Sequence, residues 1–152
     1  RRFPNLIVVR TFSKAAGLAG LRLGVLLAQR ETASALRKAQ PPFPVNVAAL
    51  AAAQAAIRDR GFVRRFVAEV AAARREFRAA LTRLGVRHWP SPANFILADF
   101  GPRAPRLLRA FARRGILLRD RRPDFPRPGY VRITVGTRAQ MRRVARLLEN
   151  ML

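Results

Sequence analysis

The chain has 152 residues and half of them are hydrophobic, so a folded protein with a core is expected and a disordered chain is excluded. It has no cysteine and one histidine, which excludes disulfides and thiolate metal sites and leaves little for a zinc site or a serine–histidine–aspartate triad, so no metal site is expected. The net charge of +23 admits a polyanion partner, but the arginines are spread along the chain among many alanines and prolines, which favours a GC-rich coding bias instead.

Neither a targeting segment nor a membrane segment is expected. The chain begins "RRFPN" without a charged and then apolar leader, and its most apolar window, 45–57, is too short to span a bilayer. The start in mid-pattern suggests a piece of a longer protein. Together with the absence of cysteine, these features favour a cytoplasmic protein.

The first 60 residues contain two apolar runs followed by two helical patterns. "NLIVV" predicts a buried strand over 5–9, and "LRLGVLLA" predicts a second strand over 21–28, with the intervening residues as a loop. "ETASALRKAQ" predicts a short helix that is ended by Pro41 and Pro42. Asn46 is a good N-cap for "VAALAAAQAAI", which is apolar on every side and is therefore expected to be buried.

The segment 62–84 predicts an amphipathic helix of about six turns. Its apolar residues recur three, four or seven positions apart, arginines fill most of the other positions, and Gly85 ends the pattern. A basic helix of this kind can lie on DNA or on a membrane, but a solvated face over a protein core is the commoner arrangement. We interpret it as a helix that connects two domains.

After this helix, strands and helices alternate. "ANFILADF" predicts a strand, "PRLLRAFARRG" a helix with Gly115 as its C-cap, "ILL" a short strand over 116–118, and "YVRITV" another strand. Thr137 and Gln140 form a capping box for a final helix. The alternation predicts an α/β or α+β protein, with a division near residue 60 into domains 1–60 and 61–152.

Position 14 carries the most informative residue, because Lys14 is one of only two lysines among 31 basic residues. A lysine amine can lose its proton and attack a carbonyl, which an arginine guanidinium cannot do. Ser13 adds a hydroxyl, the surrounding residues are small, and Arg22 supplies a planar fork that suits phosphate oxygens. Amine, hydroxyl and guanidinium together suit a cofactor that has both an aldehyde and a phosphate, such as pyridoxal phosphate.

"TFSKAAGLAGLRLG" resembles the lysine segment of fold-type I pyridoxal-phosphate aminotransferases, and most of all that of the histidinol-phosphate aminotransferase branch. The resemblance implies that Lys14 attaches to the cofactor and is the catalytic base. It also implies that Ser13 and Arg22 hold the cofactor phosphate, with Thr11 as a less certain helper. The expected fold is the C-terminal part of the large cofactor-binding domain followed by a small α+β domain.

The resemblance continues over nearly the whole chain. "PSPANFILADF", "GILLRD" and "YVRITVGT" are similar to the segments that build the small domain in this branch. By that resemblance Arg132 binds the substrate carboxylate and Arg119 helps to receive the substrate phosphate, while Asn94 either lines the site or caps a turn. Two residues depart from the family pattern: Ala16 replaces a common aromatic residue, and Val25 replaces a usual tyrosine.

The expected function is the transfer of an amino group between histidinol phosphate and a 2-oxo acid in histidine biosynthesis, by a homodimer. Another amino-acid aminotransferase or a threonine-phosphate decarboxylase of the same family remains open, because both arginines suit any carboxylate or phosphate. In the family, the aspartate that pairs with the pyridinium nitrogen precedes the lysine, so this chain alone is expected to be inactive. A basic nucleic-acid-binding module is the alternative from another class, but the chain is expected to lack an aromatic platform because Trp89 and Tyr130 are single and far apart in sequence.

Overall fold

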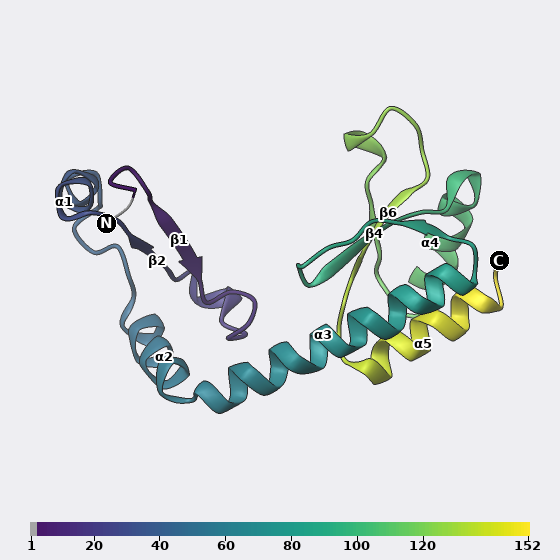
Figure 1. Ribbon diagram of the computed structural model, residues 1–152, viewed down its shortest axis with the longest axis horizontal. Helices are drawn as coiled ribbons and strands as arrows, with labels where there is room; N and C mark the ends of the chain where they lie inside the picture. The colour runs from purple at the N-terminus through teal and green to yellow at the C-terminus, as the bar shows by residue number, and fades with distance from the viewer. Residues whose placement is uncertain (1–2) are drawn as a thin grey trace. The chain divides into compact units, whose positions relative to one another are not determined.

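The computed structural model describes residues 3–152, and the chain divides into two compact units, Arg1–Phe66 and Val67–Leu152 (Figure 1). The division falls inside the long helix α3 (Arg60–Arg83), whereas we expected a boundary near residue 60.

The first unit contains an antiparallel hairpin of β1 (Val8–Thr11) and β2 (Gly24–Leu27), in which Val8 pairs with Leu27 and Thr11 with Gly24. Both strands were expected near these positions, but β1 starts three residues later than "NLIVV". The residues just before β2 form a short 3₁₀ helix (Ala19–Leu21) instead of extending the strand. The expectation of a buried strand is wrong, because every residue of both strands is exposed.

Two helices complete this unit, α1 (Arg30–Arg37) and α2 (Val47–Arg58). Asn46 is the N-cap of α2, as expected, and its Oδ1 accepts a hydrogen bond from the Ala49 amide at 2.8 Å. The expected burial of α2 is wrong: only Ala49 and Ala53 are buried, against Leu23, and the larger apolar side chains of the helix are exposed. The described part of this unit therefore has only a small core.

The second unit is a four-stranded antiparallel sheet with helices on one face (Figure 1). The strand order is β3 (Arg87–His88), β4 (Phe95–Asp99), β6 (Tyr130–Thr134) and β5 (Arg119–Asp120). The helices are the later part of α3, α4 (Ala104–Ala112) and α5 (Arg138–Glu149). The capping box of Thr137 and Gln140 begins α5, as expected.

The strand expected over 116–118 is wrong, because the ladder with β6 begins only at Arg119. The amide of Ile116 still donates to the Phe111 carbonyl at 3.0 Å, so Ile116 belongs to the exit turn of α4. The side chain of Leu117 is 86% exposed, which shows that an apolar run need not lie in a sheet.

One face of the sheet forms the core of this unit. Residues that alternate along β4 and β6 point into it, among them Ile96 and Ile133, both fully buried. Phe77 of α3, Phe111 of α4 and Leu148 of α5 pack against them. The opposite face of β4 and β6 carries the alternate residues, including Arg132, and is half-buried except at Thr134.

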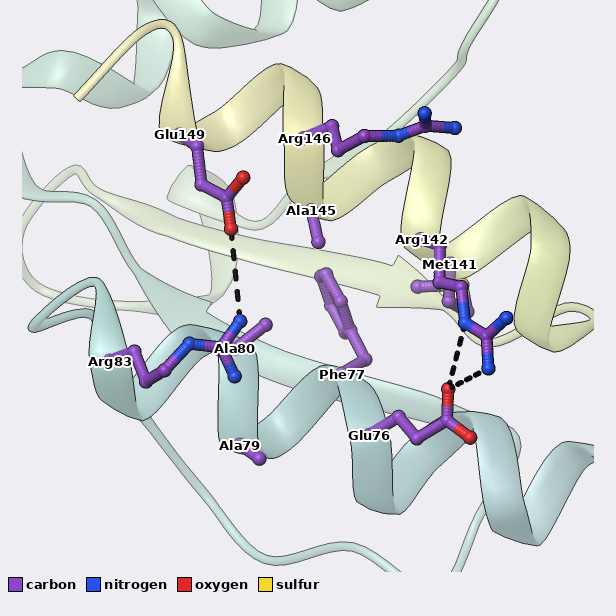
Figure 2. A pocket seen from close by; sticks show the side chains of 10 residues that line it. All are labelled: Glu76, Phe77, Ala79, Ala80, Arg83, Met141, Arg142, Ala145, Arg146 and Glu149. Carbon is purple, nitrogen blue, oxygen red and sulfur yellow. Dashed lines mark hydrogen bonds and ion pairs between the residues drawn. The ribbon is translucent and has the colours of Figure 1, made fainter.

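Helices α3 and α5 lie side by side, and ion pairs connect them along their length (Figure 2). Glu76 binds Arg142 at 3.1 Å, and Arg83 lies 3.7 Å from Glu149. These pairs border a groove of about 600 Å³ in which the Phe77 ring is seen between the helices. Four of the charged side chains that line the groove are thus paired with one another, and the groove contains no predicted site residue. Within residues 3–152, no helix combines the length and the apolar character that a bilayer crossing requires.

Candidate functional site

Lys14 lies in the loop between β1 and β2, and the loop is closed by its own backbone. The Phe12 amide donates to the Leu23 carbonyl at 3.3 Å, and the Leu18 amide donates to the Phe12 carbonyl at 3.0 Å. The Gly17 amide donates to the Lys14 carbonyl at 3.1 Å, so a tight turn follows the lysine. This arrangement presents an exposed amine on a loop that is fixed at both ends.

The hydroxyl of Ser13 is held beside the lysine by Thr11. The Thr11 hydroxyl donates to Ser13 Oγ at 2.8 Å, and the Ser13 amide donates to Thr11 Oγ1 at 3.0 Å. Because Ser13 Oγ accepts in this contact, its own hydrogen is left to donate to a ligand. The geometry therefore gives Thr11 a supporting role that orients Ser13.

Arg22 has an unusual backbone. Its φ is 54°, which makes it the one non-glycine residue with positive φ among the described residues. That conformation costs about 1–2 kcal/mol for a residue with a Cβ, and such strain is concentrated at functional sites. One guanidinium nitrogen, Nη1, donates to the Ala19 carbonyl at 3.0 Å, which folds the side chain back over the loop. No sequence pattern indicated this strain.

Ser13, Lys14 and Arg22 thus share one short loop, whereas Arg119 and Arg132 belong to the sheet of the second unit. Of the two departures from the family pattern, Ala16 lies half-buried in the loop. Val25 lies exposed in β2, opposite Arg10.

Arg119 and Arg132 are direct cross-strand partners in the β5–β6 ladder. Side chains that are directly opposite in an antiparallel pair share one face, and two like charges there repel each other. Among the described residues neither arginine forms an ion pair, and Arg132 Nε is buried without a hydrogen-bond acceptor. Sequence reasoning chose both residues but gave no sign that they are neighbours. Their arrangement is suited to an anion that neutralises both charges.

Asn94 precedes β4, and its carbonyl accepts a hydrogen bond from the Val135 amide at 2.8 Å. This bond extends the pairing of β4 and β6 by one step beyond the ladder. The residue therefore has a backbone role at the end of the sheet.

Acidic residues near the arginine pair are already engaged. The Arg122 amide donates to Asp120 at 2.9 Å, and this bond, followed by the Arg122 side chain, lowers the pKa of the Asp120 carboxyl. The described residues contain no group of three or more side chains able to hold a metal ion.

Trp89 and Tyr130, far apart in sequence, are neighbours in the structure, so their separation in sequence is not a valid argument against an aromatic platform. Their ring centroids lie 5.6 Å apart, and Phe125 stacks on Tyr130 at 4.2 Å. Arg87 covers Trp89 at 5.1 Å, and Arg127 covers Tyr130 at 5.0 Å. Since these contacts already occupy the rings within the unit, the cluster gives no support to a base-stacking platform.

Comparison with known proteins identifies the family of the chain. Residues 2–148 match the family aminotransferase class I and II. The chain is 41% identical to histidinol-phosphate aminotransferase of Symbiobacterium thermophilum over 147 residues. The aligned region covers 97% of this chain and 40% of that protein. The chain spans about 40% of the length of the curated relatives it matches.

Solved structures show the same fold. Histidinol-phosphate aminotransferase of Sinorhizobium meliloti, in complex with pyridoxal-5'-phosphate, superposes with a TM-score of 0.79 at 32% identity, over 97% of this chain and 41% of that one. L-threonine-O-3-phosphate decarboxylase of Porphyromonas gingivalis has a TM-score of 0.78 at 30% identity, over 97% and 46%. The fold is thus part of the α/β fold of these enzymes, and the chain belongs to the aminotransferase class I and II family.

Proposed function

We propose that this chain is the lysine-bearing part of a pyridoxal-phosphate-dependent aminotransferase that acts on histidinol phosphate and a 2-oxo acid. The observation that carries the proposal is the loop that presents Lys14 with Ser13 and the strained Arg22. The similarity to histidinol-phosphate aminotransferases over most of the chain supports it. A cytoplasmic homodimer is part of the same proposal.

The loop fits the cofactor chemically. Ser13 has a hydroxyl hydrogen that it can donate to a phosphate oxygen. One guanidinium nitrogen of Arg22 donates to the Ala19 carbonyl, and its other N–H groups can donate to phosphate oxygens. Pyridoxal phosphate, when bound, supplies an aldehyde to an amine and a ring that withdraws electrons. Ser13 and Arg22 would hold the phosphate group, and Lys14 would attach to the aldehyde carbon.

Lys14 and the two arginines have different roles in the proposed reaction. Lys14 moves the proton at the substrate carbon that bears the amino group, which requires the neutral amine and cannot be done by arginine. Arg132 and Arg119 orient the substrate through its anionic group, and their mutual repulsion is relieved when that group is bound. The chain alone is proposed to be inactive, because the groups that hold the cofactor ring in the family precede Lys14.

The test uses the fact that this chain has only two lysines. The 152-residue chain is incubated with pyridoxal 5'-phosphate and reduced with borohydride, and the modified residue is identified by peptide mass spectrometry. Lys14 should be modified in preference to Lys38, although both are exposed, because only Lys14 has Ser13 and Arg22 beside it. The change Lys14→Arg should abolish the preference, Arg22→Gln should reduce it, and the control Lys38→Arg should leave it unchanged. Equal labelling of the two lysines would refute the proposal.

A threonine-phosphate decarboxylase is the second candidate, which the similarity to the Porphyromonas gingivalis decarboxylase favours. Threonine phosphate has a carboxylate and a phosphate, whereas histidinol phosphate has only the phosphate as its anionic group. The test measures how much Arg119→Gln and Arg132→Gln, alone and together, weaken the affinity for histidinol phosphate and for threonine phosphate. With histidinol phosphate the effects of the two substitutions should be strongly non-additive, since both arginines then bind the same phosphate group. Additive losses, seen only with threonine phosphate, would favour the decarboxylase.

A further inference from the structure

The guanidinium of Arg132 is held without a carboxylate partner. Its Nε is buried and has no hydrogen-bond acceptor, and no ion pair to it is present in the described part of the chain. Its Cζ lies 5.2 Å from the centroid of the Phe95 ring, within the range of a cation–π contact. An aromatic face is therefore the observed partner of this charge.

The register of the sheet explains this contact. Arg132 pairs with Leu97 on β4, and Phe95 pairs with Thr134, so Phe95 and Arg132 are diagonal neighbours on one face. A diagonal neighbour is within reach of long and aromatic side chains. The ring and the cation thus come from the two central strands of the sheet.

The strand that carries Phe95 is itself anchored at its start. One guanidinium nitrogen of Arg74, on α3, donates to the carbonyls of Pro92 at 2.9 Å and Ala93 at 2.8 Å. These bonds fix the two residues that lead into β4, just before Asn94 and Phe95. The backbone that carries the half-buried Phe95 ring is therefore held at the start of the strand.

The support matters because Arg119 lies directly opposite Arg132. Repulsion between these cations favours movement of the Arg132 guanidinium away toward solvent, where it would be better hydrated. The Phe95 ring opposes that movement without neutralising the charge. A carboxylate would fix the guanidinium equally well but would remove its attraction for an anion.

We propose that Phe95 is a positioning residue, which holds the Arg132 guanidinium in place through its ring face and leaves its charge available to an anionic group. The inference rests on the anion-binding role given to Arg132 in the proposed function. It adds a residue that acts through Arg132.

The test uses the isotope-labelled 152-residue chain without cofactor. Because Arg132 Nε is inaccessible, its N–H should give a slowly exchanging NMR signal, displaced by the ring current of Phe95 and identified by its loss in Arg132→Lys. Inorganic phosphate is then titrated, and its dissociation constant is read from the backbone amides of Arg119 and Arg132.

The change Phe95→Leu should return the Nε–H signal to the position of ordinary arginines and raise the phosphate dissociation constant about fivefold, which corresponds to about 1 kcal/mol. Phe95→Tyr should keep both properties, because its ring has the same face. Phe125→Leu is the matched control, since it removes a ring that stacks on Tyr130 instead. An unchanged signal and affinity in Phe95→Leu, or equal effects of Phe125→Leu, would overturn the proposal.

If Phe95→Leu fails to fold, pentafluorophenylalanine at position 95 keeps the size of the ring and reverses its quadrupole, so it must weaken phosphate binding. Unchanged binding then overturns the proposal. A wild-type chain without any phosphate shift at Arg132 would refute the anion-binding role itself. A shift that the ring variants leave unaltered would refute only the positioning role.

Discussion

Replacement of Gly129 by alanine should destabilise the second unit strongly. The φ of Gly129 is 125°, and a Cβ there would lie 2.7 Å from Asp99 Oδ1 and 2.8 Å from the backbone nitrogen of Gly101. Backbone strain of about 1–3 kcal/mol and overpacking of about 1–3 kcal/mol add to a loss of roughly 2–6 kcal/mol. The clash cannot be relieved easily, because Asp99 is fixed by bonds to the Gly101 amide at 3.0 Å and to Arg127 at 2.6 Å.

Gly115→Ala is the matched control. Gly115 also has positive φ, 71°, but a Cβ there would meet no atom within 4 Å. Only the strain of about 1–2 kcal/mol is expected. Urea denaturation followed by fluorescence of Trp89, the single tryptophan, reports on this unit because the ring lies 5.6 Å from that of Tyr130. Equal midpoints for the two variants would refute the steric argument, whereas a much lower midpoint for Gly129→Ala would support it.

Three other outcomes are expected. Phe77→Ala should lower the free energy of unfolding by about 3–5 kcal/mol in the same assay, because the ring is 2% exposed in the main core. The pKa of the Glu69 carboxyl is lowered, first by the Arg138 amide, which donates a hydrogen bond to it at 2.8 Å. The ionised carboxylate therefore stabilises the fold at pH values above the pKa of the unfolded chain. This stabilisation should be lost as the pH falls through the lower pKa of the folded chain. Denaturation at several acid pH values should therefore show a smaller decline in Glu69→Gln than in wild type. Arg22→Gly should relieve strain and slow hydrogen exchange at the Phe12 amide up to about fivefold, while it weakens the preference of pyridoxal 5'-phosphate for Lys14.

Local chemistry allowed much of the second unit to be predicted from the sequence. The capping box at Thr137 and Gln140, the amphipathic pattern of α3 and the alternation in β4 and β6 each depend on residues close together in the chain. The predicted strand over 116–118 failed because an apolar run cannot show whether a partner strand lies beside it. In the first unit, the two strands and α2 have the apolar composition that is typical of buried elements. Most of their apolar side chains are nevertheless exposed in the described part of the unit.

The candidate site was predictable in part for a similar reason. Lys14 could be predicted because a lysine amine can attack a carbonyl and an arginine guanidinium cannot. Ser13 and Arg22 were predicted from the motif around it. The pairing of Arg119 with Arg132 and the contact of Arg132 with Phe95 depend on strand register, which the sequence does not display. The left-handed conformation of Arg22 could not be foreseen either, because arginine carries no local signal for positive φ.

The position of α5 has a consequence for the way the second unit forms during synthesis. This helix supplies Met141, Val144 and Leu148 to the core, and Arg142 binds Glu76, which lies 66 residues earlier. At a ribosomal rate of about 5–20 residues per second, the apolar face of α3 must wait about 3 to 13 s before its partner helix has been made. During that interval the part of the α3 surface that α5 covers is open to chaperones and to other nascent chains. Completion of this core is therefore a late event that depends on translation of the last helix.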